Sequence, residues 1–345
     1  MSFADFLSQG HIIKHFRKAI NNDHLSHAYI FTGQNGIGKS LFAKEFSKAL
    51  FCNKSKGDSC NICKNCIRID NNTHPDIHWI VLEKKSKFIK IDNIRNLQHF
   101  VKLSPVESEY KVFIIKEADR MNEEASNCLL KTLEEPTPNT FIILTADSLM
   151  PIRETIRSRC QIVRFTPIPN HIIKDQLVKI FNADTREIEW VSRFCNGSLG
   201  DAIELLREKF YEKNNDIVNR ISGLNMGNFN FAEEFIDSYL GSSDSLEEKR
   251  QTLKRILNCI LQFYRDLLMV KIRNVHSARK KKLPLFNAER EEALQGLVNY
   301  LTQEQIITIV DEILLTIKHL DYNLNINLLV ENIFARIAVL NSAER

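Results

Sequence analysis

Eight residues of the sequence have the types and spacing of a phosphate-binding loop. Residues 33–40 read GQNGIGKS and match G-x-x-x-x-G-K-[ST] at every fixed position. Gly33, Gly36 and Gly38 let backbone N–H groups surround phosphate oxygens, and the amino end of a following helix adds positive charge. Lys39 is expected to reach the outer phosphates, and Ser40 to bind Mg²⁺. The sequence therefore predicts a nucleotide site, with ATP and Mg²⁺ as candidate ligands.

The acidic position that nucleotide hydrolysis requires is altered in this chain. Such a site needs an acid at the end of a neighbouring strand to hold the metal and water. The strand expected at 111–115 is followed by Lys116 and then Glu117. A cation thus stands where the metal-holding aspartate usually lies, which is unfavourable beside Mg²⁺. Glu117 remains as a residual catalytic acid, so we expect ATP hydrolysis by this chain to be weak or absent.

Four cysteines form the second group of residues whose types and spacing could support a chemical function. Cys52, Cys60, Cys63 and Cys66 follow the spacing C-x7-C-x2-C-x2-C. Zinc takes four soft ligands in a tetrahedron, and four thiolates leave no position open for water, which predicts a structural Zn²⁺ site. The alternative is a redox or disulfide cluster, which is unusual in a reducing compartment. His74 is either a spare ligand or, as we expect, a solvated loop histidine.

Short apolar runs alternate with helical patterns in the first half of the chain. Strands are expected at 27–31, 76–82, 111–115, 140–145 and 161–165, and helices at 41–50, 91–101 and 121–133. Strands that alternate with helices form a mostly parallel sheet covered on both faces. The phosphate loop then lies between the first strand and the next helix, as its chemistry requires.

The pattern changes after residue 165, which predicts three domains. An α/β P-loop domain is expected at 1–165, with the cysteine insertion at about 52–66. A small helical domain follows at 166–207, and residues 208–345 are predicted to be helical throughout. Two apolar stripes are expected in the last domain, one of Leu253, Ile256, Leu257, Ile260, Leu261 and Tyr264, and one of Ile307, Val310, Ile313 and Leu314.

Bulk composition excludes few functions. The net charge of +4 over 345 residues is too small to argue for nucleic-acid binding by itself. We see no signal peptide and no long apolar stretch, so we expect a cytoplasmic protein without membrane association. The basic run at 278–282 is expected to be a solvated loop, with contact to DNA phosphates as the alternative. The cluster of Lys84, Lys85 and Lys87 is also expected to lie in a hairpin or loop.

Four features together resemble the clamp-loader family of bacterial DNA polymerase III, whose members are AAA+ proteins. They are the phosphate loop after HAYIFTG, the four-cysteine insertion, the run NCLLKTLEEP at 127–136 and the triplet Ser158-Arg159-Cys160. The resemblance covers about the first 210 residues. It implies an α/β P-loop AAA+ domain with helices on both faces of a parallel sheet, then a small helical lid and an all-α collar domain for oligomerisation.

Two residues acquire roles from this resemblance alone. The arginine of the Ser-Arg-Cys triplet acts in trans in the family, so Arg159 is expected to stabilise charge on the γ-phosphate of a neighbour's ATP as an arginine finger. The alternative is an ion pair between Arg159 and a local carboxylate. Thr145, near the end of the fourth strand, is similar to the family's polar sensor of γ-phosphate.

Two departures from the family's motor subunits indicate a subunit without turnover. Motor subunits carry an Asp-Glu pair where this chain has Lys116 and Glu117, and an arginine in a Gly-Ser-Leu-Arg-Asp-Ala run where it has Gly200. The resemblance therefore implies a stator that gives an arginine to a motor neighbour. Two alternatives stay open, namely an ATP-hydrolysing motor subunit and another AAA+ remodelling ATPase with a zinc insertion.

The resemblance also implies partners. A stator of this family assembles with motor subunits and a delta subunit into a hetero-pentamer, as part of a DNA polymerase holoenzyme in DNA replication. It would act on the sliding clamp indirectly and reach primer–template DNA through the complex.

Overall fold

The protein consists of two compact units. The structure is a computed structural model that describes residues 2–83, 86–228, 230–241, 245–275, 285–287, 290–320, 322 and 324–342. One unit comprises Met1–Ala183 with Cys195–Glu204, and the other Asp184–Phe194 with Leu205–Arg345. The domain boundaries expected near 165 and 207 stay predictions.

The first unit is built on a five-stranded parallel sheet with the order β2-β3-β4-β1-β5. The strands are β1 (Ala28–Thr32), β2 (Ile77–Ile80), β3 (Lys111–Ile115), β4 (Thr140–Ala146) and β5 (Gln161–Arg164). The helices are η1 (Phe3–Asp5), α1 (Gly10–Asn21), α2 (Lys39–Phe51), α3 (Lys64–Asp70), α4 (Ile91–Lys102), η2 (Ala118–Arg120), α5 (Glu123–Glu134), α6 (Glu154–Arg157) and α7 (Asn170–Ile180). The expected fold class is confirmed, and each expected strand and helix lies within about two residues of its predicted ends.

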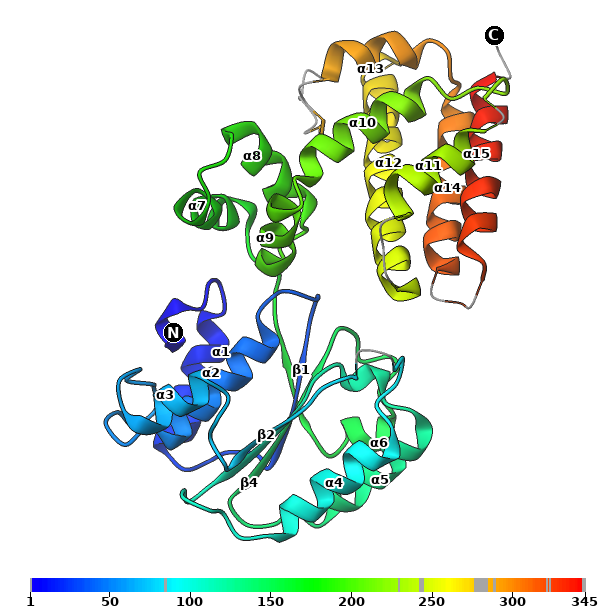
Figure 1. The fold of residues 1–345 in the computed structure, drawn as a ribbon. Helices are drawn as coiled ribbons and strands as arrows, with labels where there is room; N and C mark the ends of the chain where they lie inside the picture. Colours follow the sequence, from blue (N-terminus) through cyan, green and yellow to red (C-terminus); the bar gives the residue numbers. More distant parts are fainter. Residues whose placement is uncertain are drawn as a thin grey trace. The chain divides into compact units, whose positions relative to one another are not determined.

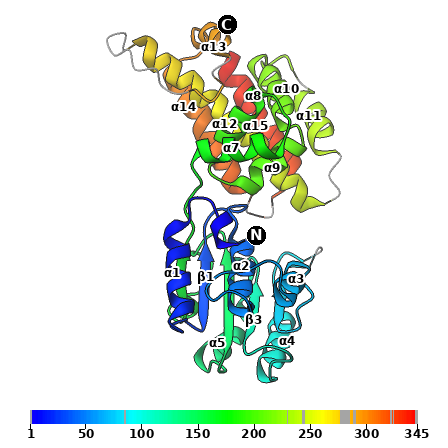
Figure 2. The same ribbon diagram turned by 90° about the vertical axis from the view of Figure 1, so that its left-hand side faces the viewer.

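Helices cover both faces of this sheet. Figures 1 and 2 show α1, α2 and α3 on one face and α4, α5 and α6 on the other. The central strands β1, β3 and β4 are accordingly buried along their whole length. Buried parallel strands are apolar on both sides, which explains why their sequences are continuous rather than alternating apolar runs.

The two faces of the sheet have different cores. Rings dominate the α1/α2 face, where Phe16 contacts the rings of Tyr29, Phe31, Phe42 and Phe46 with centroids 5.1–5.8 Å apart. The α4/α5 face is mainly aliphatic. Interlocked rings bury large areas and prefer tilted contacts, so they hold α2 firmly against β1.

The second unit is helical. Its helices are α8 (Thr185–Phe194), α10 (Phe210–Ser222), α11 (Phe231–Leu240), α12 (Leu246–Val275), α13 (Glu291–Val298), α14 (Gln303–His319) and α15 (Ile326–Ser342). Helix α9 (Leu199–Arg207) crosses the boundary between the units. The core is formed by apolar faces of α10 to α15, with the long α12 contributing most of its length.

One of the two expected apolar stripes is confirmed and the other is wrong in part. Of the first stripe, five residues on α12 are at most 1% exposed, namely Leu253, Ile256, Leu257, Ile260 and Tyr264. Of the second stripe, Ile313 is buried, whereas Ile307 and Leu314 are 41% and 48% exposed. The buried face of α14 contains Ile306, Ile309 and Ile313. Residues 307 and 314 are seven apart and share a different face of the helix.

Two basic clusters can be placed only in part. The run at 278–282 and residues Lys84 and Lys85 lie outside the described residues, so the loop expectations for them stay predictions. Lys87 is exposed in the connection between β2 and α4. Within the described ranges, no helix is both long and apolar enough to cross a membrane.

Candidate functional site

The loop between β1 and α2 carries the predicted phosphate-binding residues. β1 ends at Thr32, and α2 begins at Lys39. Gly36 and Gly38 have φ values of 72° and 103°, a region that residues with a Cβ rarely adopt. The conformation of this loop therefore requires glycine at both points, whereas the sequence motif fixes glycine only at 33 and 38.

The amino group of Lys39 has three oxygen partners. It donates to the carbonyl oxygens of Gly33 (2.5 Å) and Gln34 (2.9 Å) and to Oδ1 of Asp147 (2.8 Å), and the residue is only 7% exposed. Asp147 was not expected from the sequence. It follows β4, which pairs with β1, and the carboxyl ends of adjacent parallel strands meet at one sheet edge. A phosphate that enters the loop must compete with Asp147 for the lysine.

The residues that end or follow β3 and β4 form a hydrogen bond, an ion pair and a cation–π contact. Thr145 is buried, and its hydroxyl oxygen accepts from the backbone N–H of Glu117 at 3.3 Å. The Glu117 carboxylate pairs with Arg120 at 3.1 Å. The ammonium of Lys116 lies over the Trp79 indole, 5.2 Å from its centroid. The candidate acid and sensor are thus brought together, but the acid is neutralised by a local arginine.

The start of α9 packs directly on the phosphate loop. The N–H of Gly200 donates to the carbonyl oxygen of Gly36 at 2.9 Å. A Cβ on Gly200 would lie 2.9 Å from both Cα and O of Gly36, and one on Gly36 would lie 2.3 Å from Oγ of Ser198. Such distances are sterically excluded. Gly200 is therefore required for a backbone contact.

This contact predicts that Gly200 cannot be substituted without loss of stability. Gly200→Ala should lower the free energy of unfolding by about 1–3 kcal/mol, because the opposing atoms are backbone and cannot move aside cheaply. Gly200→Arg should be at least as destabilising and should not create ATP turnover. Urea titration and ATPase assays measure both effects. Gly296→Ala is the matched control, since its Cβ would meet nothing within 4 Å. A stable Gly200→Arg variant that hydrolyses ATP would contradict the prediction.

Arg159 lies near the amino ends of the strands, whereas the phosphate loop lies at their carboxyl ends. It precedes β5, whose first residue Gln161 pairs with Tyr29 near the start of β1, whereas the loop follows Thr32 at the end of β1. At about 3.3 Å per residue, the length of β1 separates the two by roughly 16 Å. The guanidinium of Arg159 therefore lies far from the nucleotide site of its own chain.

Local groups hold the Arg159 side chain. Its guanidinium forms an ion pair with Glu134 at 2.7 Å and donates to the carbonyl oxygen of Thr155 at 2.9 Å. The arginine side chain is 36% exposed and the glutamate 48%. The local ion pair considered as an alternative is thus present. An exposed pair contributes little free energy, so a phosphate can replace Glu134 without a large penalty.

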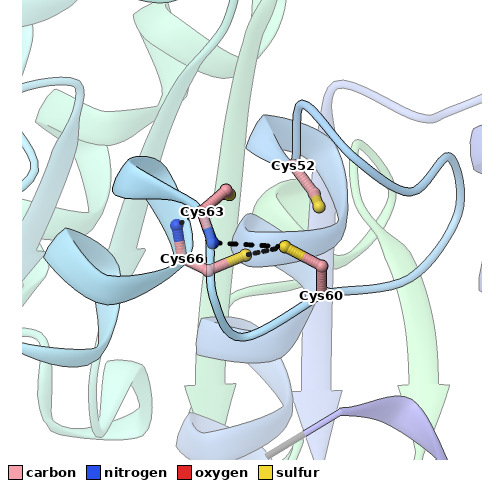
Figure 3. A group of neighbouring side chains, drawn as sticks. All are labelled: Cys52, Cys60, Cys63 and Cys66. Carbon is pink, nitrogen blue, oxygen red and sulfur yellow. Dashed lines mark hydrogen bonds between the residues drawn. The ribbon is translucent and has the colours of Figure 1, made fainter.

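The four cysteines of the insertion converge on one point. All four sulfur atoms lie within 4.8 Å of one another, and Sγ of Cys60 is 4.0 Å from Sγ of Cys66 (Figure 3). Backbone N–H groups of Cys63 and Cys66 point at Sγ of Cys60 and Cys63, at 3.3 and 3.5 Å. Backbone donors directed at ligand sulfur atoms stabilise thiolates. The arrangement fits a tetrahedral metal ion bound by sulfur alone.

The thiols of this cluster differ in acidity. The backbone N–H of Ile62, with that of Cys63, lowers the pKa of Cys60 to about 6. Burial raises the pKa of Cys66. Cys60 can thus bind a metal as thiolate at neutral pH, whereas a bound cation is needed to displace the proton of Cys66.

A polar network attaches the cysteine insertion to α2. Lys48 is fully buried and contacts Oδ1 of Asn61 at 2.5 Å, Glu45 at 3.1 Å and Asp70 at 3.0 Å. Oγ of Ser59 donates to the other oxygen of Glu45 at 3.2 Å. Buried charges need such partners. The insertion is therefore joined to the same helix that begins at the phosphate loop.

His74 does not belong to the metal group, and the expectation that it is solvated is wrong. It is only 4% exposed, and its ring lies 4.9 Å from that of Phe51. Its Nδ1 accepts from the N–H of Asp76 at 3.2 Å. The Asp76 carboxylate in turn accepts three backbone N–H groups at 106–108, which closes the loop over the histidine. Burial lowers the pKa of His74.

A phosphate loop between β1 and α2 of a parallel sheet defines the first unit as a P-loop α/β domain, and the second unit is helical. Residues 8–169 match the family model described as DNA polymerase III, delta subunit. The DNA polymerase III subunit delta' of Bacillus subtilis is 30% identical, over 94% of this chain and 94% of its own length. The chain therefore belongs to the delta-prime family of DNA polymerase III clamp-loader subunits, which are proteins of DNA replication.

Proteins named after other DNA polymerase III subunits are also similar to this chain. The DNA polymerase III subunit tau of Bacillus subtilis is 31% identical over 78% of this chain, which corresponds to 50% of tau. A solved DNA polymerase III gamma subunit-related protein from Thermotoga maritima is 21% identical, covers 95% of this chain and 99% of its own, and has a TM-score of 0.44.

Proposed function

We propose that this chain is a non-motor stator of the sliding-clamp loader, which presents Arg159 to the ATP of a neighbouring motor subunit. Its partners are then motor subunits and a delta subunit in a hetero-pentamer. The sliding clamp and primer–template DNA are reached through that complex. The guanidinium would stabilise charge on the neighbour's γ-phosphate through a forked pair of hydrogen bonds.

The position of Arg159 is the observation that carries this proposal. It lies at the opposite end of the strands from the phosphate loop, at a distance of roughly 16 Å by strand length. An arginine finger must contact the phosphate that it stabilises, so Arg159 cannot serve a nucleotide bound to its own chain. Its partial exposure and its weak surface ion pair leave it accessible to another molecule.

The state of its own nucleotide site supports the absence of turnover. The metal-holding position is filled by Lys116, and the Glu117 carboxylate pairs with Arg120. Lys39 is occupied by Asp147 and by loop carbonyl oxygens. The loop can still accept a phosphate or nucleotide, but Asp147 and Glu117, the acids described beside it, are already paired with Lys39 and Arg120 rather than free to hold Mg²⁺ and activate water.

The four cysteines have a structural role in this proposal. Four soft sulfur donors within 4.8 Å of one another fit Zn²⁺, and they leave no coordination position for a substrate. Bound zinc would hold residues 52–66 in place and, through Lys48 and Glu45, support α2.

An ATPase measurement on the isolated chain tests the proposal. The purified full chain with Mg²⁺ and ATP should show turnover at least about 100-fold below the typical 1 s⁻¹ lower range of enzymes. The same preparation should raise ATP hydrolysis when it is added to motor subunits with clamp and primed DNA. Rapid magnesium-dependent hydrolysis by the lone chain would instead identify a motor subunit.

A further inference from the structure

An open cavity lies along the edge strand β2. It has a volume of about 750 Å³ and reaches from Ser40, at the start of α2, to Phe100 on α4. Amide side chains, among them Asn72 and Asn96, line it together with Lys44, Lys116 and aromatic rings. None of its fifteen described lining residues is acidic. Ser40 of the phosphate loop and Lys116 belong to this lining, and none of the four clustered cysteines does.

Trp79 is one of the aromatic rings that line this cavity. It lies on β2, the edge of the sheet, and is partly exposed, whereas Trp190 is 2% exposed. His78 stacks on Phe100 of α4 and Phe113, with both centroids 4.8 Å away. Successive side chains of a strand point to opposite faces, so the indole lies on the face covered by α2. A large aromatic ring at a sheet edge, partly open to solvent, is a stacking surface.

Two lysines supply positive charge to this cavity. The ammonium of Lys116 lies 5.2 Å from the indole centroid. The ammonium of Lys44 donates to the backbone carbonyl oxygen of Asp70 at 2.7 Å, which leaves its charge uncompensated. Across the described ranges, neither lysine pairs with a carboxylate. Lysines and an aromatic ring in a cavity whose described lining contains no acidic residue form a combination that can bind single-stranded nucleic acid.

We propose that this cavity binds single-stranded DNA, with a base stacked at Trp79 and the adjoining phosphates at Lys44 and Lys116. Stacking accepts any base, and the amide groups can bond to base edges without selecting one sequence. Duplex DNA would bind poorly, because its bases are already stacked on one another. The site gives this subunit its own contact with DNA and does not depend on the role of Arg159.

Tryptophan fluorescence tests this site directly. The chain has two tryptophans, so Trp190→Phe leaves Trp79 as the single reporter. A fifteen-nucleotide oligo(dT) should quench that emission to saturation, and a duplex of equal length should not. With labelled oligo(dT) and the full chain, Trp79→Ala should weaken binding by about tenfold, as expected for loss of one stacked base. If Trp190→Phe lowers stability, the fluorescence anisotropy of labelled oligo(dT) is measured instead, on chains that keep Trp190.

Salt dependence tests the two lysines. For single strands, each phosphate contact contributes about 0.7 to the slope of log K against log salt, so the double change Lys44→Ala and Lys116→Ala should reduce the slope by about 1.4. Lys14→Ala, an exposed lysine of α1 outside the cavity, should leave it unchanged. Absence of quenching, or unaltered binding by Trp79→Ala, would overturn the proposal. Quenching by other loader subunits but not by oligo(dT) would also overturn it and would mark a protein interface.

Discussion

In a clamp loader rebuilt with Arg159→Ala, ATP hydrolysis at the site that Arg159 faces should fall by about 1,000-fold. If Arg159 acts in trans as proposed, alanine removes the guanidinium that stabilises the charge developing on the γ-phosphate. Arg159→Lys should restore little of the loss, because an ammonium keeps the charge but lacks the planar fork. Hydrolysis stimulated by clamp and primed DNA, measured on the purified complex, reports the effect.

The controls separate a lost finger from a damaged subunit. Arg153→Ala removes an arginine of similar exposure that pairs with Glu123 in the same region, and it should leave turnover nearly unchanged. Glu134→Gln removes the local partner of Arg159 but keeps the guanidinium, so turnover should stay within about threefold, as the weakness of a surface ion pair implies. Assembly should survive in every variant. If Arg159→Ala retains normal hydrolysis in an intact complex, the trans role is wrong.

The sequence was sufficient for features that depend on local spacing. The arrangement of the glycines in residues 33–40, and that of the four cysteines from Cys52 to Cys66, is determined by a short segment of the chain. The order of strands and helices was also accessible, because buried parallel strands appear as apolar runs between amphipathic segments. These are the features that the structure reproduces with bounds close to those predicted.

Contacts between segments far apart in the chain could not be predicted from the sequence. Asp147 is 108 residues from Lys39, and Gly200 meets Gly36 across a still longer stretch of chain. Their proximity results from the parallel register of β1 with β4 and from the path of the chain after β5. Gly200 looked only like a missing arginine in the sequence, whereas its backbone contact gives glycine a positive reason to be there.

Burial of single polar residues was also misjudged. His74 resembled a solvated loop residue because polar neighbours surround it in the sequence. It is buried because the Asp76 carboxylate gathers three N–H groups from residues 106–108 above it. From the sequence, Lys116 was interpreted only as a cation at the position that usually holds a metal. In the structure its ammonium lies over the Trp79 ring. Side-chain partners of this kind depend on tertiary packing rather than on sequence spacing.

Cys63→Ser should abolish zinc binding and destabilise the first unit. The wild-type chain should carry about one zinc, and the variant almost none, since a serine hydroxyl is a poor ligand for a soft tetrahedral site. A ligand present at a thousand times its dissociation constant stabilises the folded state by about 4 kcal/mol, so a loss of that order is expected. Metal analysis and thermal unfolding measure the two effects. Cys128→Ser, outside the cluster, should keep the metal.

A chelator added to the wild-type chain distinguishes metal loss from misfolding of the variant, and hydrogen exchange shows how far the effect spreads. Residues 52–66 should exchange faster in both cases, because Asn61 and Ser59 then no longer fix Lys48 and Glu45. The part of α2 around Phe42 and Phe46 should stay protected, since both side chains are fully buried among rings that do not depend on the metal. Zinc would then support the insertion without controlling the phosphate loop. A wild-type chain without zinc, or unchanged exchange after chelation, would contradict a structural metal at these cysteines.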